Sequence, residues 1–88
     1  MELRLLRYFL AVAEEENITR AAASLHITQS SLSRQIMELE NEIGKRLLIR
    51  GKRKITLTDE GILLRKRAEE IISLCEKTER ELTEKGNI

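Results

Sequence analysis

The second part of the chain carries the pattern of one long helix, and this feature constrains the fold most. Thr58 is a good N-cap, and Asp59 and Glu60 follow it, where acidic side chains suit the positive end of a helix. The 88-residue chain contains no proline, so we predict a single helix from there to about residue 84. Alternating spacings of four and three residues form one stripe along it: Leu64, Ala68, Ile71, Cys75, Thr78 and Leu82. Such a heptad seam outruns the chain's own small core and predicts a partner helix.

Three shorter helices are predicted ahead of this long one. The first covers 2–15, where apolar residues recur at helical spacing. The second covers 18–25 and the third covers about 29–43; Asn17 and Thr28 stand directly before them as N-caps. Two short helices separated by a three-residue break form a helix-turn-helix pattern.

The predicted third helix has two distinct faces. One stripe is expected to face the core: Leu32, Ile36, Leu39 and Ile43. A second face lies on another side of the helix and consists of Gln29, Ser30, Ser33, Arg34 and Met37. Near the start of the helix this face has short polar side chains. Farther along, Glu38, Glu40 and Glu42 would repel a polyanion. Any nucleic-acid contact is therefore expected in the first two turns.

A basic hairpin is predicted between the third helix and the long one. Gly44 is expected to end the third helix, and the pattern over 47–57 favours two short strands around a cationic turn. The run Lys45–Lys54 carries six positive charges and no acid. Such a run attracts polyanions by charge alone, although a basic run in isolation fits a solvated loop equally well.

The composition argues against an enzyme, a metal site and a bound cofactor. His26, Cys75 and Asp59 are the only residues of their types, so no nucleophile–base couple or metal-ligand spacing exists. His26 is expected to close the turn between two helices. No apolar run approaches the length that spans a bilayer, and the N-terminus lacks a signal-peptide pattern. With one cysteine, these features favour a cytoplasmic protein without membrane contact.

The run ITRAAASLHITQSSLSRQIMELENEIGKRLLIRGKRKITLTDEG closely resembles the N-terminal DNA-binding domain of LysR-type transcriptional regulators, and the start of the chain resembles that family too. The resemblance implies a mainly α fold: a winged helix-turn-helix of three helices and a short β-hairpin over 1–58, followed by a linker helix for dimerisation over 59–88. It also implies a C-terminal effector-binding domain, which would hold any small-molecule effector and is absent here. The chain is then a fragment or a short natural protein, and the fragment interpretation is favoured.

The resemblance also implies which residues contact DNA. Gln29, Ser33 and Arg34 resemble the base-edge readers of the family's recognition helix, since Arg and Gln form bidentate contacts with guanine and adenine. Ser30 stands where many members have proline, and its hydroxyl is expected to reach a phosphate or a base. Ser31 fits a phosphate contact or a helix cap equally well.

The wing and the second helix complete the expected interface. Arg53 resembles the wing arginine that enters a narrow minor groove, and Lys52 and Lys54 beside it are expected to meet phosphate. Thr19 and Arg20 are placed to bind backbone phosphate at a helix start. Leu48 stands where the family often has an aromatic residue, so we expect slightly thinner packing under the wing.

These observations favour sequence-specific binding of double-stranded DNA by a homodimer in a bacterial transcriptional regulator. A homodimer is expected to prefer an inverted repeat. The alternative is a coiled-coil interaction module whose helix-turn-helix does not bind DNA.

Overall fold

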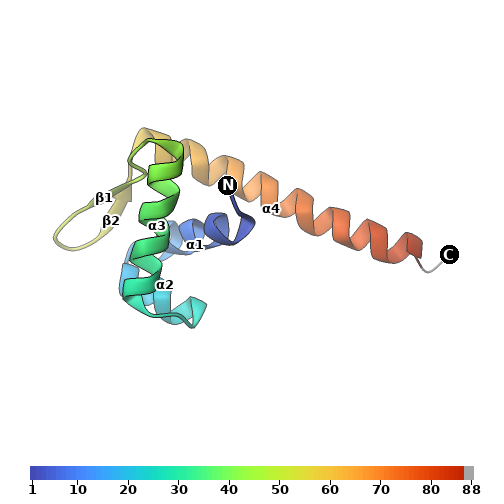
Figure 1. Cartoon of the computed structure of the whole chain (residues 1–88), viewed down its shortest axis with the longest axis horizontal. Coiled ribbons are helices and arrows are strands. Elements are labelled where there is room, and N and C mark those ends of the chain that lie inside the picture. Colours follow the sequence, from blue (N-terminus) through green and yellow to red (C-terminus); the bar gives the residue numbers. More distant parts are fainter. Residues whose placement is uncertain (87–88) are drawn as a thin grey trace.

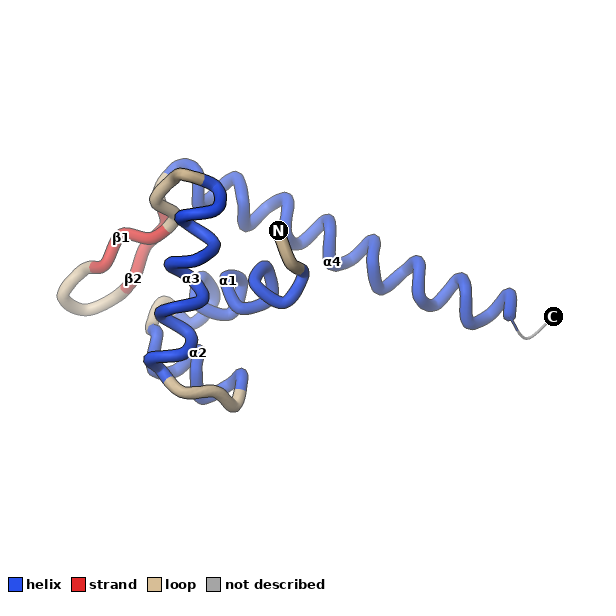
Figure 2. Tube along the Cα trace, viewed as in Figure 1, coloured by secondary structure: helices blue, strands red, loops and turns tan. Residues whose placement is uncertain are grey.

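The computed structural model describes residues 1–86 and contains every element that the sequence predicts (Figure 1). In chain order these are α1 (Leu3–Glu15), α2 (Ile18–Leu25), α3 (Gln29–Ile43), β1 (Leu48–Arg50), β2 (Ile55–Leu57) and α4 (Asp59–Gly86). The first three helices and the hairpin form one body, from which α4 projects (Figure 2). This projection makes the molecule 54 Å long but only 26 by 20 Å across.

Side-chain caps fix the starts of three helices at the predicted positions. The Asn17 side chain accepts a hydrogen bond from the Arg20 amide at 2.8 Å, and Thr28 Oγ1 accepts one from the Ser31 amide at 3.1 Å. At α4, Thr58 Oγ1 accepts from the Gly61 amide at 3.0 Å. Each bond satisfies an amide that has no partner inside its helix, so the bounds of the helix-turn-helix follow directly from these short polar residues.

The main core lies where α1, α2 and α3 meet beneath the hairpin. Its largest fully buried side chains are Phe9, Val12, Leu32, Ile36, Leu39 and Leu47. The prediction for the fourth residue of the α3 stripe is wrong, because Ile43 is 36% exposed. It lies in the last turn of α3, and Leu47, after the reversal at Gly44, enters the core instead. Leu48, where the family often has an aromatic residue, is buried and belongs to this core as well.

The hairpin is fastened to the helices at both of its strands. β1 and β2 pair antiparallel, with Ile49 opposite Thr56. The Glu40 carboxylate accepts hydrogen bonds from the Leu47 and Leu48 amides at 2.7 and 3.3 Å. On the other strand, the Ile55 amide donates to the Glu16 carbonyl at 2.9 Å. These contacts set the position of the wing relative to α3 and to the α1–α2 turn.

A second, smaller core joins α4 to α1. Leu6, Ala68 and Ile72 are buried there, and Leu10 and Leu64 pack against them. This corrects the assignment of Leu64 and Ala68 to the dimerisation stripe, because both are covered by their own chain. On α4 the residues of this contact recur every four residues, which forms one of the ridges by which helices pack.

None of the helices within residues 1–86 is long and apolar enough to cross a membrane.

Candidate nucleic-acid interface

The first two turns of α3 present their polar side chains to solvent. Gln29, Ser30 and Arg34 are exposed, and Ser33 is half-buried. The Thr19 hydroxyl of α2 donates to Gln29 Oε1 at 3.2 Å, so the starts of α2 and α3 lie side by side. The helix-turn-helix therefore presents one continuous polar surface formed by the N-terminal ends of two helices.

The serines near this surface differ in their surroundings. Ser30 Oγ lies 3.4 Å from Thr28 Oγ1 and is exposed. Ser31 is half-buried, and its hydroxyl accepts a hydrogen bond from Gln35 Nε2 at 3.1 Å. Ser31 thus forms two hydrogen bonds at the start of α3, through its amide to Thr28 and through its hydroxyl to Gln35. Ser30, by contrast, is exposed to solvent.

His26 occupies the turn between α2 and α3. It has a left-handed backbone, with φ of 59°, and its amide donates to the carbonyls of Ala22 and Ala23. This is the turn-closing role that the sequence predicts, and it fixes how α3 follows α2.

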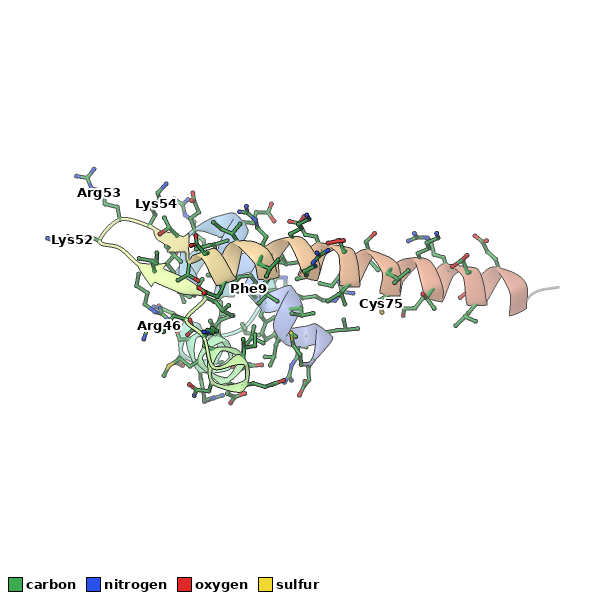
Figure 3. The ribbon with its side chains drawn as sticks, turned by 90° about the horizontal axis from the view of Figure 1, so that it is seen from above. Phe9, Arg46, Lys52, Arg53, Lys54 and Cys75 are labelled. Carbon is green, nitrogen blue, oxygen red and sulfur yellow. The ribbon has the colours of Figure 1, made fainter. Side chains whose placement is uncertain are left out.

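The wing tip is a cluster of exposed cations. Figure 3 shows Lys52, Arg53 and Lys54 projecting from the end of the hairpin. The tip is tight, because the Gly51 amide donates to the Lys54 carbonyl at 3.1 Å and a Cβ at Gly51 would lie 2.8 Å from that oxygen. This hydrogen bond closes the backbone turn that carries the three cations.

A groove of about 240 Å³ connects the wing with the helix-turn-helix. Thr19, Gln29 and the three wing cations line it together, so the structure brings these five predicted residues to one site. Arg20, Ser30, Ser31, Ser33 and Arg34 do not line the groove. The predicted residues therefore lie partly within the groove and partly on the helices outside it.

Sequence reasoning missed two charged residues in this groove, Arg50 and Glu16. Arg50 belongs to the basic run, but its place on β1 beside the groove depends on the hairpin register. Glu16 is the C-cap residue of α1, and no sequence pattern assigns it to the interface. Within residues 1–86, Lys54 alone among the predicted cations has an ion pair, at 3.6 Å from the Glu16 carboxylate.

The stripe predicted for dimerisation divides between two environments. Leu64 and Ala68 pack against α1, and Cys75 is half-buried. Ile71 and Leu82 are 41% and 67% exposed, and Thr78 is exposed with its hydroxyl bonded to the Leu74 carbonyl. Leu74, which the heptad pattern missed, is 63% exposed on the same side of α4. Exposed apolar residues of α4 thus lie on both sides of its contact with α1, because Ile62 and Leu63 before that contact are 49% and 57% exposed.

Comparisons with known proteins agree with this architecture. The model of the family described as bacterial regulatory helix-turn-helix protein, lysR family, matches residues 3–62. The Hca operon transcriptional activator HcaR of Escherichia coli (strain K12) is 61% identical over 61 residues, which are 69% of this chain and 21% of HcaR. The HTH-type transcriptional regulator BsdA of Bacillus subtilis (strain 168) is 51% identical over 73 residues, 82% of this chain and 25% of BsdA.

Solved structures match over nearly the whole chain. The BenM_DBD/catB site 1 DNA complex has a TM-score of 0.92 and 44% identity, covering 96% of this chain and 93% of that one. The CbnR_DBD–DNA complex has a TM-score of 0.94 and 37% identity, covering 98% and 99%. The chain spans about a quarter of the length of the curated relatives, which are named as regulators and activators of transcription and not as enzymes. With a family model that matches two thirds of its residues, the chain belongs to the lysR family of bacterial regulatory helix-turn-helix proteins.

Proposed function

We propose that this chain is the sequence-specific DNA-binding module of a bacterial LysR-type transcriptional regulator. The observation that carries the proposal is the convergence of the exposed start of α3, the start of α2 and the cationic wing around one groove. An α-helix fits the major groove of B-form DNA, and a cationic tip beside it fits the adjacent minor groove. The solved DNA complexes of BenM_DBD and CbnR_DBD, which share this architecture, support the same conclusion.

The proposal gives the side chains of the interface different tasks. Arg34 and Gln29, assisted by Ser33 and Ser30, read base edges from α3, because their side chains offer paired hydrogen-bonding groups. Arg53 enters the minor groove from the wing tip. The phosphate contacts then come from the remaining predicted residues, namely Thr19, Arg20, Ser31, Lys52 and Lys54. They supply most of the affinity but no sequence information.

We further propose that two copies pair through the linker segment 59–88, of which the structure describes residues 59–86 as α4. The dimerisation surface is revised to the exposed residues Ile71, Leu74, Thr78 and Leu82, with Cys75 at its edge. Pairing with a second copy would cover these apolar side chains through a two-fold contact. Two copies would then present two α3 helices to an inverted repeat.

The whole regulator is expected to be longer than this chain. Its curated relatives are more than three times as long as this chain, which leaves room for an effector-binding domain elsewhere in the regulator. We place the regulator in the bacterial cytoplasm, where the chromosome lies. The alternative, a helical interaction module without DNA binding, is not favoured, because solved relatives of the same architecture are DNA complexes.

Selection from a random duplex pool tests this function. The wild-type chain is expected to enrich an inverted repeat, and the double variant Lys52→Ala/Arg53→Ala should enrich it poorly. Lys77→Ala/Arg80→Ala is the matched control, because it removes two exposed positive charges from α4, away from the groove. Failure of the wild-type chain to enrich any sequence would contradict the proposed function and favour the interaction module.

A further inference from the structure

One acidic side chain, Glu16, lies among the cations that line the groove. The Glu16 carboxylate is 3.6 Å from Lys54 Nζ, and both side chains are partly exposed, at 49% and 62%. Lys52 and Arg53 line the same groove. A carboxylate on a surface that binds DNA repels the phosphate groups. The effect of Glu16 on DNA binding therefore needs a physical explanation.

The backbone of Glu16 holds this carboxylate in place beside the wing. Its amide donates to the Val12 carbonyl at 2.8 Å, and its carbonyl accepts from the Ile55 amide at 2.9 Å. Its φ of 55° is left-handed, a conformation that disfavours side chains and that glycine adopts freely. The fold therefore fixes Glu16 relative to β2 without needing a side chain at this position.

We infer that Glu16 is a positioning residue that holds the Lys54 side chain in the free protein and competes with DNA phosphate for it. The inference rests on the proposed function. DNA must replace the Glu16 carboxylate with a phosphate before Lys54 contributes fully to binding. Glu16 thereby lowers the sequence-independent part of the affinity.

The size of the effect follows from Coulomb's law. In water-like surroundings, removing a unit charge about 6 Å from a phosphate strengthens binding about three-fold at low salt. A lysine released from its carboxylate also displaces up to about one more counterion from DNA. The slope of log affinity against log salt should therefore become steeper by up to ~0.9.

The test is a titration of a random-sequence duplex at several salt concentrations with the folded chain. Glu16→Gln removes the charge and keeps the side-chain length, and Glu16→Gly removes it while suiting the left-handed backbone. Both are expected to bind about three-fold more tightly than wild type at low salt, with the steeper salt slope. Glu14→Gln is the matched control, because Glu14 is exposed on α1 and does not line the groove.

Repeating the comparison in a Lys54→Met background separates the positioning role from a general charge effect. If Glu16 acts through Lys54, Glu16→Gln should change the slope little once Lys54 is absent. Equal effects of Glu16→Gln and Glu14→Gln, or an undiminished slope change without Lys54, would overturn the inference alone. A wild-type chain that binds no duplex at any salt concentration would overturn the proposed function, and this inference with it.

Discussion

Replacing Gly61 with alanine should destabilise the junction between α4 and the hairpin. A Cβ at Gly61 would lie 2.2 Å from the Leu47 carbonyl oxygen, whereas ordinary contacts begin at 3.4 Å, so this distance must open by about 1.2 Å. That oxygen accepts the Thr58 amide at 3.1 Å, so the shift also weakens a hydrogen bond worth about 1 kcal/mol. Overpacking costs about 1–3 kcal/mol and alanine regains at most about 1 kcal/mol of helix propensity. We expect a net loss of about 2 kcal/mol, which lowers Tm by roughly 10 °C in a domain of this size.

Urea and thermal denaturation followed by circular dichroism measure this loss. Gly44→Ala is the control, because Gly44 has a φ of +78° but a Cβ added there would have nothing within 4 Å. That variant should lose only about 1 kcal/mol, from the left-handed backbone alone. If Gly61→Ala were as stable as wild type, the close approach of α4 to Leu47 would be refuted.

Three further predictions address the interface, the linker helix and the N-terminus. Arg34→Ala should cost about 1–3 kcal/mol of binding free energy on the preferred duplex and relax the preference at one base pair, whereas Lys52→Ala should weaken binding to all duplexes alike. Competition titrations with different duplexes distinguish these patterns. If Arg34→Ala left the sequence preference unchanged, Arg34 would be a phosphate contact. Leu74→Glu should yield a monomer in sedimentation equilibrium at micromolar concentration, because pairing would bury a charge on each copy; a dimeric Leu74→Glu chain would exclude this surface. The hydrogen bond and charge of Glu42 raise the pKa of the Met1 α-amino group above 8.0. The ion pair therefore stabilises the fold below pH 8, and this contribution is lost as the pH rises through the raised pKa of the amino group. Glu42→Gln should return that pKa toward 8.0 in an NMR titration, and an unchanged pKa would exclude the contact.

The sequence predicts most of this fold because local signals decide it. Asn17, Thr28 and Thr58 each cap a helix where a short polar side chain precedes a run of helix formers. Gly44 ends α3 with the left-handed backbone that glycine favours. These features depend on close neighbours in the chain, so no knowledge of tertiary packing is needed to find them.

The errors arise where packing between distant segments decides. The heptad rule assigns Leu64 and Ala68 to a seam for a partner helix, but both pack on α1, together with Ile72, four residues after Ala68. A sequence shows apolar spacing on a helix but not which side another helix already covers. Ile43 fits the α3 stripe equally well, yet the chain reversal brings Leu47 into the core instead.

The candidate site is predictable only in part for the same reason. The resemblance to the family points to Gln29 and the wing cations, and the structure brings them to one groove. Glu16 and Arg50 join that groove only through the hairpin register and the Ile55–Glu16 backbone bond. Their roles depend on contacts between segments that are far apart in the chain, which no local pattern records.

The dependence of duplex affinity on salt tests the central claim most directly. Phosphate contacts from the wing and from the starts of α2 and α3 release counterions, so log affinity should fall linearly with log salt. With three cations assigned to phosphate in each of two copies, namely Arg20, Lys52 and Lys54, the slope is expected to be about −5 on double-stranded DNA of the preferred sequence. A flat response, or equal affinity for DNA and for an uncharged polymer, would contradict the claim that this surface binds DNA.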